Sequence, residues 1–396
     1  MKNEAVIVAA LRTPTGRFMG EMATQSAVQL GATVVKALLR QTGVAGDAVD
    51  DVIMGQVLTA GCGQNPARQT ALHAGLPVTV SAMTVNLVCG SGLKAVQLAA
   101  QSIENGTAEI IIAGGQECMS QAPYLLSDAR QGQRFGHGKM LDSILHDGLW
   151  DAFNDYAMGI TAENLAQKYA IGREAQDNFA LLSQQKAHIA QQCGRFHAEI
   201  VPVTLAGKKE TRIVSEDQQP RPDATLASLA ALRPAFTADG SVTAGNASSL
   251  NDGAAAVLVM SRERAAALGL PVMATLVASA TAGVEPALMG IGPVAASQRC
   301  LQRAGWDVES LDLIEANEAF AAQALAVNQE MGWPAERVNV NGGAIALGHA
   351  IGASGCRILV TLLHEMQRRD AVRGLATLCV GGGQGVALAV SREPAE

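Results

Sequence analysis

The sequence predicts an α/β protein made of two related strand–helix units, with a further segment inserted into the first unit. Three observations lead to this fold class. Apolar, β-branched runs alternate with segments of helical period, which is the order that parallel strands and crossover helices produce. Glycine supplies 41 of the 396 residues, which suits tight turns and close backbone approaches. Similar strand and turn motifs recur in the last third of the chain.

The first third of the chain carries the alternating pattern. Strands are predicted from apolar runs at residues 5–11, 52–58, 83–88 and 109–113. Helices are predicted from periodic segments at residues 26–40, 67–74 and 91–104. The first and last of these helices end at Gly43 and Gly106, because glycine readily adopts the backbone conformation that closes a helix.

Between residues 119 and 246 the composition changes, and glutamine, aspartate, arginine and proline become frequent. Helical patterns remain at 160–169 and 173–190, and the strand pattern returns at 254–260. We therefore predict an inserted loop or cap domain over 119–246. The two halves of the core are then residues 1–118 with 247–270, and residues 271–396.

The last third of the chain repeats motifs of the first third. The matching pairs are residues 51–56 with 312–317, residues 90–94 with 353–357, and residues 110–116 with 377–384. Three matches in one order indicate two copies of one unit. Two such units can pack face to face, with their loops meeting in one cleft.

Composition and charge exclude some classes of partner. The chain has 29 Lys and Arg against 36 Asp and Glu, a net charge of −7, which does not attract DNA or anionic membranes. Aromatic residues make up 3% of the chain, which argues against stacking on nucleic-acid bases. We therefore predict no nucleic-acid partner and no membrane partner. An anionic ligand would need a local basic pocket.

The cysteines and histidines give no sign of a metal site. The seven cysteines form no CxxC pair and the seven histidines no HExxH motif. Scattered cysteines suit a reducing compartment, and no apolar run reaches membrane-spanning length. The run 5–11 is better explained as a buried first strand than as a signal peptide. The expected location is the cytoplasm, and no metal is expected.

Cys89 lies between the predicted strand 83–88 and a helix that begins at Ser91, with Gly90 beside it. A thiol at a helix N-terminus meets unpaired backbone N–H groups and the positive end of the helix dipole, and both favour the reactive thiolate. For an isolated cysteine, a small buried core side chain would be the preferred interpretation. Partners elsewhere in the chain favour a nucleophile.

Those partners lie in three later segments. His349 stands in a glycine-rich loop before a helix, where it can take a thiol proton or bind an acyl oxygen. Cys379 ends a strand before a triple-glycine turn whose N–H groups can hold an oxyanion. Asn317, at another strand end, can hold a water or a carbonyl. Taken singly, a packed histidine, a buried cysteine and a polar cap explain these residues as well.

At these segments the chain resembles the thiolase family, the acetyl-CoA C-acyltransferases, and most of all its short-chain biosynthetic members. The resemblance covers nearly the whole chain, and its marks are residues 88–92, 317–320, 341–349 and 379–383. It implies a layered α-β-α-β-α core of duplicated units. It also implies that the inserted domain serves CoA binding and oligomerisation, as a homotetramer or a homodimer.

The resemblance implies a role for each motif residue. Cys89 would be the nucleophile that carries the acyl group, and His349 would activate it and help to bind the thioester oxygen. Cys379 would deprotonate the second acetyl-CoA at its methyl carbon. Asn317 would hold the water that completes one oxyanion hole with His349, while the N–H groups of Cys89 and Gly381 would form the other.

The resemblance also implies a substrate site. The residues that would line the CoA site are Leu149, Met158, Arg221, Ser228, Ala235, Phe236, Ala244, Ser248, Ala319 and Phe320. Arg221 could meet the nucleotide end of CoA, although a solvated loop charge is an equally available interpretation. Two positions depart from the family pattern. Ala350 stands where relatives commonly have proline after the histidine, and Ala157 stands where short-chain relatives often have histidine.

The expected activity is an acyl-CoA C-acyltransferase of fatty acid metabolism. It would condense two acetyl-CoA molecules to acetoacetyl-CoA and CoA, or cleave a 3-ketoacyl-CoA with CoA, through an acyl-cysteine and a ping-pong mechanism. CoA and acyl-CoA are its substrates, and no cofactor is expected. One alternative is a decarboxylating condensing enzyme of the ketoacyl-synthase type, which would lack Cys379. Another is a catalytically silent acyl-CoA-binding protein. Acyl-chain length is not readable from any motif.

Overall fold

The computed structural model describes residues 3–207 and 210–392 and contains one large mixed sheet. Its first half has the spatial order β1-β12-β5-β3-β4, formed by β1 (Ala5–Arg12), β12 (Asn251–Ser261), β5 (Ile110–Cys118), β3 (Asp51–Gly55) and β4 (Ser81–Val85). Its second half has the order β14-β15-β16-β13, formed by β14 (Leu313–Ala316), β15 (Arg373–Val380), β16 (Gln384–Ser391) and β13 (Ala274–Gly283). The short β2 (Gly16–Arg17) pairs with β12.

The two halves join through β1 and β13, which pair antiparallel at Val6 with Thr275 and at Ile7 with Ala274. Each half repeats the same arrangement. In the first, β3 runs parallel to β5, and β12 pairs antiparallel with β5. In the second, β14 runs parallel to β15, and β16 pairs antiparallel with β15. The sheet is therefore mixed, whereas the alternating pattern had predicted parallel strands.

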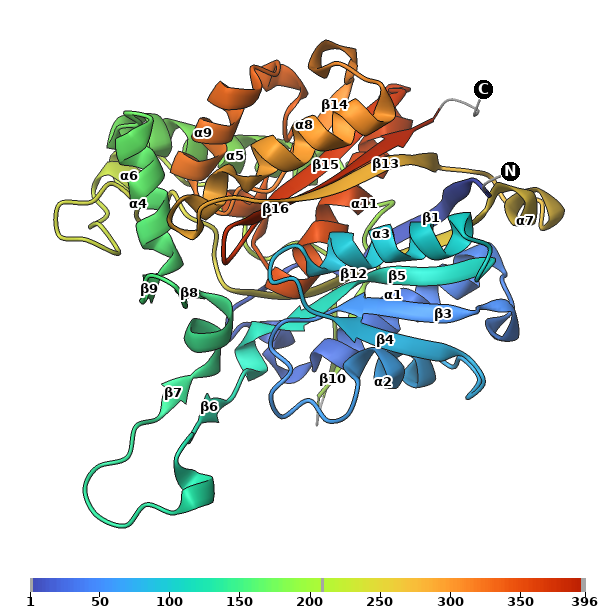
Figure 1. The fold of residues 1–396 in the computed structure, drawn as a ribbon, viewed down its shortest axis with the longest axis horizontal. Helices are drawn as coiled ribbons and strands as arrows, with labels where there is room; N and C mark the ends of the chain where they lie inside the picture. The colour runs from blue at the N-terminus through green and yellow to red at the C-terminus, as the bar shows by residue number, and fades with distance from the viewer. Residues whose placement is uncertain (1–2, 208–209, 393–396) are drawn as a thin grey trace.

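The helices form three layers around the two halves of the sheet, as Figure 1 shows. In the middle layer, α3 (Ser91–Glu104) and α11 (Ile351–Arg369) pack in one core with the inner faces of both halves. On the outer side of the first half lie α1 (Ala27–Thr42) and α2 (Pro66–His73). On the outer side of the second half lie α8 (Gly292–Ala304) and α9 (Ala321–Met331). The layered α-β-α-β-α core is thus confirmed.

Local sequence signals explain the helix ends. Ser26 and Gln29 form a reciprocal capping box at the start of α1, and Gly43 closes the helix with a φ of 70°. Glycine also allows the middle helices to meet. A Cβ atom at Gly92 of α3 would lie 2.9 Å from the backbone nitrogen of Cys356 on α11. The short α7 (Arg262–Ala267) and α10 (Ala344–Leu347) connect larger elements.

Three predicted strands end well away from the observed C-terminal ends. The prediction 52–58 ran too far, since β3 ends at Gly55 and the buried carboxylate of Glu117 then accepts the N–H groups of Val57 and Leu58. The prediction 83–88 also ran too far, because β4 ends at Val85. The prediction 109–113 stopped too early, because β5 continues through Gly114 and its neighbour to Cys118.

The predicted insertion contains helices and short hairpins. The helices are α4 (Met158–Lys168), α5 (Arg173–Gln192) and α6 (Leu226–Ala230). The hairpins are β6 (Tyr124–Leu125) with β7 (Leu141–Asp142), β8 (Trp150–Asp151) with β9 (Tyr156–Ala157), and β10 (Val203–Ala206) with β11 (Thr211–Val214). Among the described residues, none of these strands joins the large sheet.

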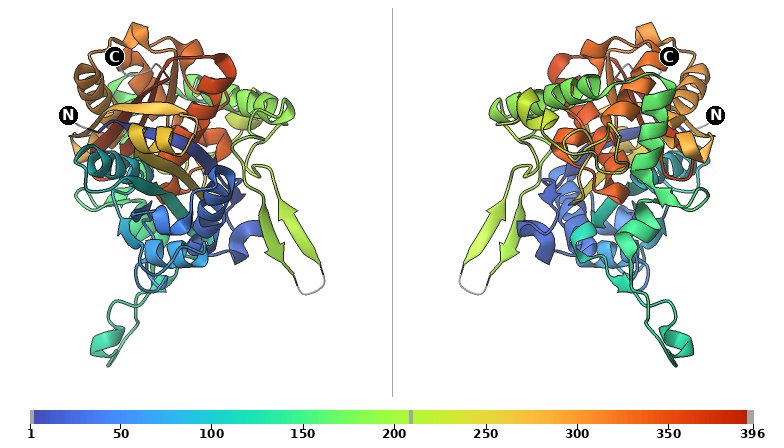
Figure 2. Two further views of the ribbon diagram at one scale, coloured as in Figure 1. Left: turned by 90° about the vertical axis from the view of Figure 1, so that its right-hand side faces the viewer. Right: turned by 90° about the vertical axis from the view of Figure 1, so that its left-hand side faces the viewer.

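Two of the hairpins extend away from the body. The loop between β6 and β7 projects at the lower left of Figure 1, and the hairpin of β10 and β11 projects in the views of Figure 2. The domain boundaries stay a prediction, and their outermost residues, 1–2 and 393–396, lie outside the described part. Within that part, no helix is both long and apolar enough to cross a membrane.

Candidate active site

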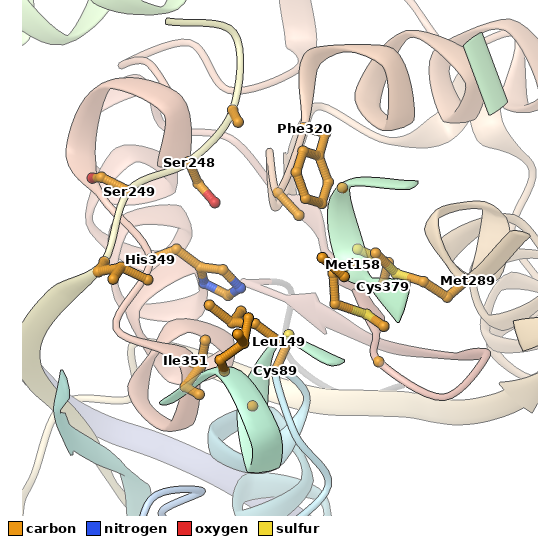
Figure 3. Close-up of a pocket in the computed structure, with 18 of the residues that line it drawn as sticks. Cys89, Leu149, Met158, Ser248, Ser249, Met289, Phe320, His349, Ile351 and Cys379 are labelled. Atoms are coloured by element: carbon orange, nitrogen blue, oxygen red, sulfur yellow. The ribbon is translucent and has the colours of Figure 1, made fainter. Parts of the chain in front are cut away.

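A cavity of about 190 Å³ opens where the two halves of the core meet the insertion. Most of the predicted site residues line it, namely Cys89, His349, Cys379, Gly381, Leu149, Met158, Phe236, Ser248, Ala319 and Phe320. Figure 3 shows Cys89, His349 and Cys379 around the same space, with apolar side chains on its walls. The segments that the sequence singled out separately thus form one site.

Cys89 lies in a tight turn directly before Gly90, the N-cap of α3. Val88 has a φ of 43°, in the left-handed region that a β-branched residue rarely adopts, at a cost of about 1–3 kcal/mol. The side chain of Asn86 accepts the N–H of Val88 at 2.9 Å, and Ser91 Oγ accepts the N–H of Leu87 at 2.8 Å. These local bonds stabilise the strained turn that connects the end of β4 to the start of α3.

The side chain of Cys89 is a neutral thiol, not a thiolate. It borders the cavity, but burial raises its pKa to about 11, against the lowering effect of the N–H groups of Gly381 and of Cys89 itself. Glu117 adds a repulsive negative charge. The sequence-based expectation that the helix N-terminus favours thiolate is therefore outweighed by burial, and Cys89 requires a base.

His349 meets that requirement. It lies in the loop between α10 and α11, where its backbone N–H donates to Asn251 Oδ1 at 2.9 Å. Its ring Nδ1 lies 2.6 Å from Ser354 Oγ, and its Nε2 has no partner among the described residues. Burial, with a smaller effect from the Arg357 cation, lowers its pKa to about 4. The imidazole is therefore neutral near pH 7 and able to accept a proton.

Cys379 lies near the end of β15, where it is 1% exposed. Burial raises the pKa of its thiol, and the nearby Cys89 raises it further. The turn to β16 passes through Gly382 and Gly383, which have φ values of 85° and 86° and therefore suit only glycine without strain. This turn brings the N–H of Gly381 next to the sulfur of Cys89.

Asn317 follows β14 and is buried, but it does not line the cavity. Its backbone N–H donates to the carbonyl of Thr377 at 3.0 Å. Neither side-chain atom of Asn317 has a partner among the described residues. An unpaired buried amide is costly, so this residue is suited to a polar ligand such as water. Its role in an oxyanion hole stays a prediction.

Comparison with known proteins identifies the family. The model of the thiolase N-terminal domain matches residues 5–263, and that of the thiolase C-terminal domain matches residues 270–392. The chain belongs to the thiolase family. The resemblance found in the sequence is thereby confirmed.

Several thiolases are similar over the whole chain. The acetyl-CoA acetyltransferase of Pseudomonas aeruginosa is 65% identical over 98% of this chain and 100% of its own length. The probable acetyl-CoA acetyltransferase of Escherichia coli K12 is 62% identical over 98% of this chain and 99% of its own. The crystal structure of the Bacillus anthracis acetyl-CoA acetyltransferase has a TM-score of 0.97 at 45% identity, covering 98% of this chain and 99% of that one.

The predicted CoA-binding residues of this thiolase fall into two groups. Six line the cavity, and among them Phe236 and Phe320 form an edge-to-face pair with ring centroids 6.2 Å apart. The other four are exposed on the insertion outside the cavity, namely Arg221, Ser228, Ala235 and Ala244. Their part in binding the remote end of CoA stays a prediction.

Sequence reasoning missed several residues of the thiolase site. The cavity wall also contains Met119, Leu145, Gly148, Leu250, Met289 and Ile351, most of which carry no recognisable motif. Asn251 and Ser354 both hydrogen-bond to His349, Asn251 at its backbone N–H and Ser354 at its ring Nδ1. Ser354 left a signal, because it aligns with Ser91 in the internal repeat. Glu117 left none, since its partners are distant in the chain.

Proposed function

We propose that this thiolase is an acetyl-CoA acetyltransferase. It condenses two acetyl-CoA molecules to acetoacetyl-CoA and CoA, or cleaves a 3-ketoacyl-CoA with CoA in the reverse direction. The observation that carries the proposal is the meeting of two thiols and a neutral histidine at one cavity, Cys89, Cys379 and His349. The names of its relatives support the same activity.

In the first half-reaction, His349 Nε2 takes the proton of Cys89 while the sulfur attacks the thioester carbonyl. The negative oxygen that forms is stabilised by backbone N–H groups at the Gly381 turn. His349 then gives its proton to the leaving CoA sulfur, and acetyl-Cys89 remains. Asn317 holds the water that assists His349 at the second oxyanion site.

In the second half-reaction, Cys379 passes its proton to the neutral His349, and the thiolate so formed removes a proton from the methyl carbon of the second acetyl-CoA. The resulting carbanion attacks acetyl-Cys89, and the carbon–sulfur bond to Cys89 breaks. The Cys89 thiolate then receives the proton that His349 holds, and Cys379 keeps the proton taken from the methyl carbon. Both cysteines are therefore thiols in the resting enzyme, which agrees with burial raising the pKa of each.

The proposal includes partners and setting. The reaction needs a nucleophile, a base and oxyanion donors, so the enzyme works without a metal or other cofactor, with CoA and acyl-CoA as substrates. A reducing cytoplasm suits its free cysteines. Exposed apolar residues on the β6–β7 loop support assembly as a homotetramer or a homodimer. Fatty acid metabolism is the matching physiological context.

The test is acyl transfer by matched cysteine variants. Cys89→Ala is expected to lose thiolysis of acetoacetyl-CoA and to form no acetyl adduct by intact mass. Cys379→Ala is expected to keep the adduct, because it retains Cys89 and His349, but to lose thiolysis. Cys193→Ala, at an exposed cysteine, is the control and is expected to behave as wild type. Substantial thiolysis by Cys89→Ala would refute the proposal.

A further inference from the structure

Among the described residues, one side chain hydrogen-bonds the ring of His349, that of Ser354 in the first turn of α11. Ser354 Oγ lies 2.6 Å from His349 Nδ1 and 2.9 Å from the carbonyl oxygen of Ala350. A hydroxyl group has one hydrogen to donate and can accept from other donors. The carbonyl of Ala350 can only accept, so that hydrogen points to Ala350. Oγ is then left to accept from the imidazole.

The other half of the duplicated core contains a comparable serine. Ser91 occupies the first turn of α3, where Ser354 occupies the first turn of α11. Ser91 Oγ donates to the carbonyl of Val88 at 2.6 Å and accepts the backbone N–H of Leu87 at 2.8 Å. A backbone N–H can only donate, so the direction of both bonds at Ser91 is fixed. The repeat supports the same directions at Ser354.

We propose that Ser354 is a positioning residue that fixes His349 as the Nδ1–H tautomer, so that the Nε2 lone pair faces the cavity. Nδ1 must carry the hydrogen that Ser354 accepts. A neutral imidazole has one ring hydrogen, so Nε2 is then bare. Nε2 is also the ring atom that has no partner among the described residues.

This inference rests on the proposed function and deepens it. The wrong tautomer would direct an N–H at the thiol of Cys89, and His349 could not take its proton. The backbone bond from His349 N–H to Asn251 Oδ1 places the residue but leaves the ring free to exchange its hydrogen. Ser354 is thus the contact that selects the tautomer, while Asn251 places the loop.

The experiment compares Ser354→Ala, Ser354→Thr and a matched control. The control is Ser297→Ala, which removes a buried hydroxyl on α8 that has no partner among the described residues. We expect Ser354→Ala to lower kcat for acetoacetyl-CoA thiolysis roughly 10- to 100-fold, by analogy with the loss of a hydrogen bond that orients a metal-binding histidine. KM should change less than about twofold, because substrate contacts are kept. Ser354→Thr keeps the hydroxyl and should restore most of kcat.

A spectroscopic measurement separates tautomer control from a general loss of structure. In protein labelled with ¹⁵N-histidine, with His349→Gln used to assign the signals, wild-type His349 should be protonated at Nδ1 and bare at Nε2. In Ser354→Ala the Nε2–H form should appear. Alkylation of Cys89 by iodoacetamide at fixed pH should slow in Ser354→Ala and stay unchanged in Ser297→Ala.

Two outcomes would overturn the inference. One is a wild-type His349 protonated at Nε2, and the other is a Ser354→Ala variant with wild-type kcat and alkylation rate. Failure of the proposed function is distinguishable, because the ¹⁵N and alkylation measurements need no turnover. An enzyme that shows the expected tautomer shift but no thiolysis would refute the activity and leave the role of Ser354 standing.

Discussion

At the scale of single residues, burial decides the chemistry of the site. It holds Cys89 as a thiol and His349 as a neutral base, although the helix N-terminus favours thiolate. Beneath them lies Glu117, fully buried, whose carboxylate accepts the N–H groups of Val57, Leu58 and Gly352. Burial outweighs these three bonds and raises the pKa of Glu117 to about 7.

This shift predicts a pH dependence of stability. The raised pKa means that the folded protein binds a proton at Glu117 more tightly than the unfolded chain, so stability falls as pH rises through the interval from about 4.5 to 7. Glu117→Gln, a neutral mimic of the protonated side chain, should lose about 3 kcal/mol less than wild type between pH 5 and 8. Urea unfolding at both pH values measures this difference. Equal losses in the two proteins would contradict it.

The residue scale also separates what the sequence could predict from what it could not. Cys89, His349 and Cys379 stand in glycine-rich segments whose turns are local, so their motifs could be recognised. Ser354 and Glu117 act through hydrogen bonds, and Glu117 bonds to Gly352, which lies 235 residues away in the sequence. No local pattern records the pairing of Glu117, and the signal of Ser354 was its match with Ser91 in the internal repeat. The left-handed Val88 was equally hidden, because β-branched residues normally avoid that conformation.

At the scale of elements, the contact of α3 with α11 sets the position of the site, since Cys89 precedes one helix and His349 precedes the other. A periodic pattern could predict each helix. It could not predict how closely α3 approaches α11, because that distance depends on glycines that contact the backbone of the other helix. The end of β5 shows the same effect. The predicted strand stopped before Gly114 and Gly115, but the observed strand continues through them. Glycine is needed at both positions, because a Cβ atom there would overlap the carbonyl oxygens of Ala255 and Gly352.

A substitution at this helix contact should be destabilising. In Gly92→Ala, the new Cβ would lie 2.9 Å from Cys356 N and 3.0 Å from Gly352 O, both backbone atoms of α11. We expect a loss of about 1–3 kcal/mol in the free energy of unfolding, as for an overpacked core. The control is Gly172→Ala, at an exposed position where a Cβ meets nothing within 4 Å. Urea midpoints of the two variants should differ clearly, and matching midpoints would rule out the steric explanation.

At the scale of the whole molecule, the cavity is shared among three parts of the chain. The first half supplies Cys89, the second half supplies His349 and Cys379, and the insertion supplies Met158 and Phe236. The internal repeat made a shared cleft predictable. The apolar wall of the cavity could not be predicted, because its residues come from segments without motifs. Which of these residues meet depends on the path of the insertion in three dimensions.

The projecting β6–β7 loop predicts assembly with further copies of the chain. Phe135 is fully exposed and Met140 is 63% exposed. Apolar side chains exposed together in this way often mark a surface that binds another protein. Phe135→Ser with Met140→Ser should lower the mass measured by light scattering after size exclusion. Ile213→Ser, on the β10–β11 hairpin and 66% exposed, is the control. An unchanged mass in the double variant would show that the loop is not an interface.

The position of β12 has a consequence for how the protein is made. β12 is the strand between β1 and β5, yet the ribosome reaches it only at residue 251. Until then β1, which is buried along its whole length, lacks the neighbour with which it pairs most extensively. Such an open apolar edge invites pairing with other nascent chains. The sheet of the first half can therefore be completed only after the insertion has been synthesised. During that interval the nascent chain is most prone to aggregate through the unpaired edge of β1.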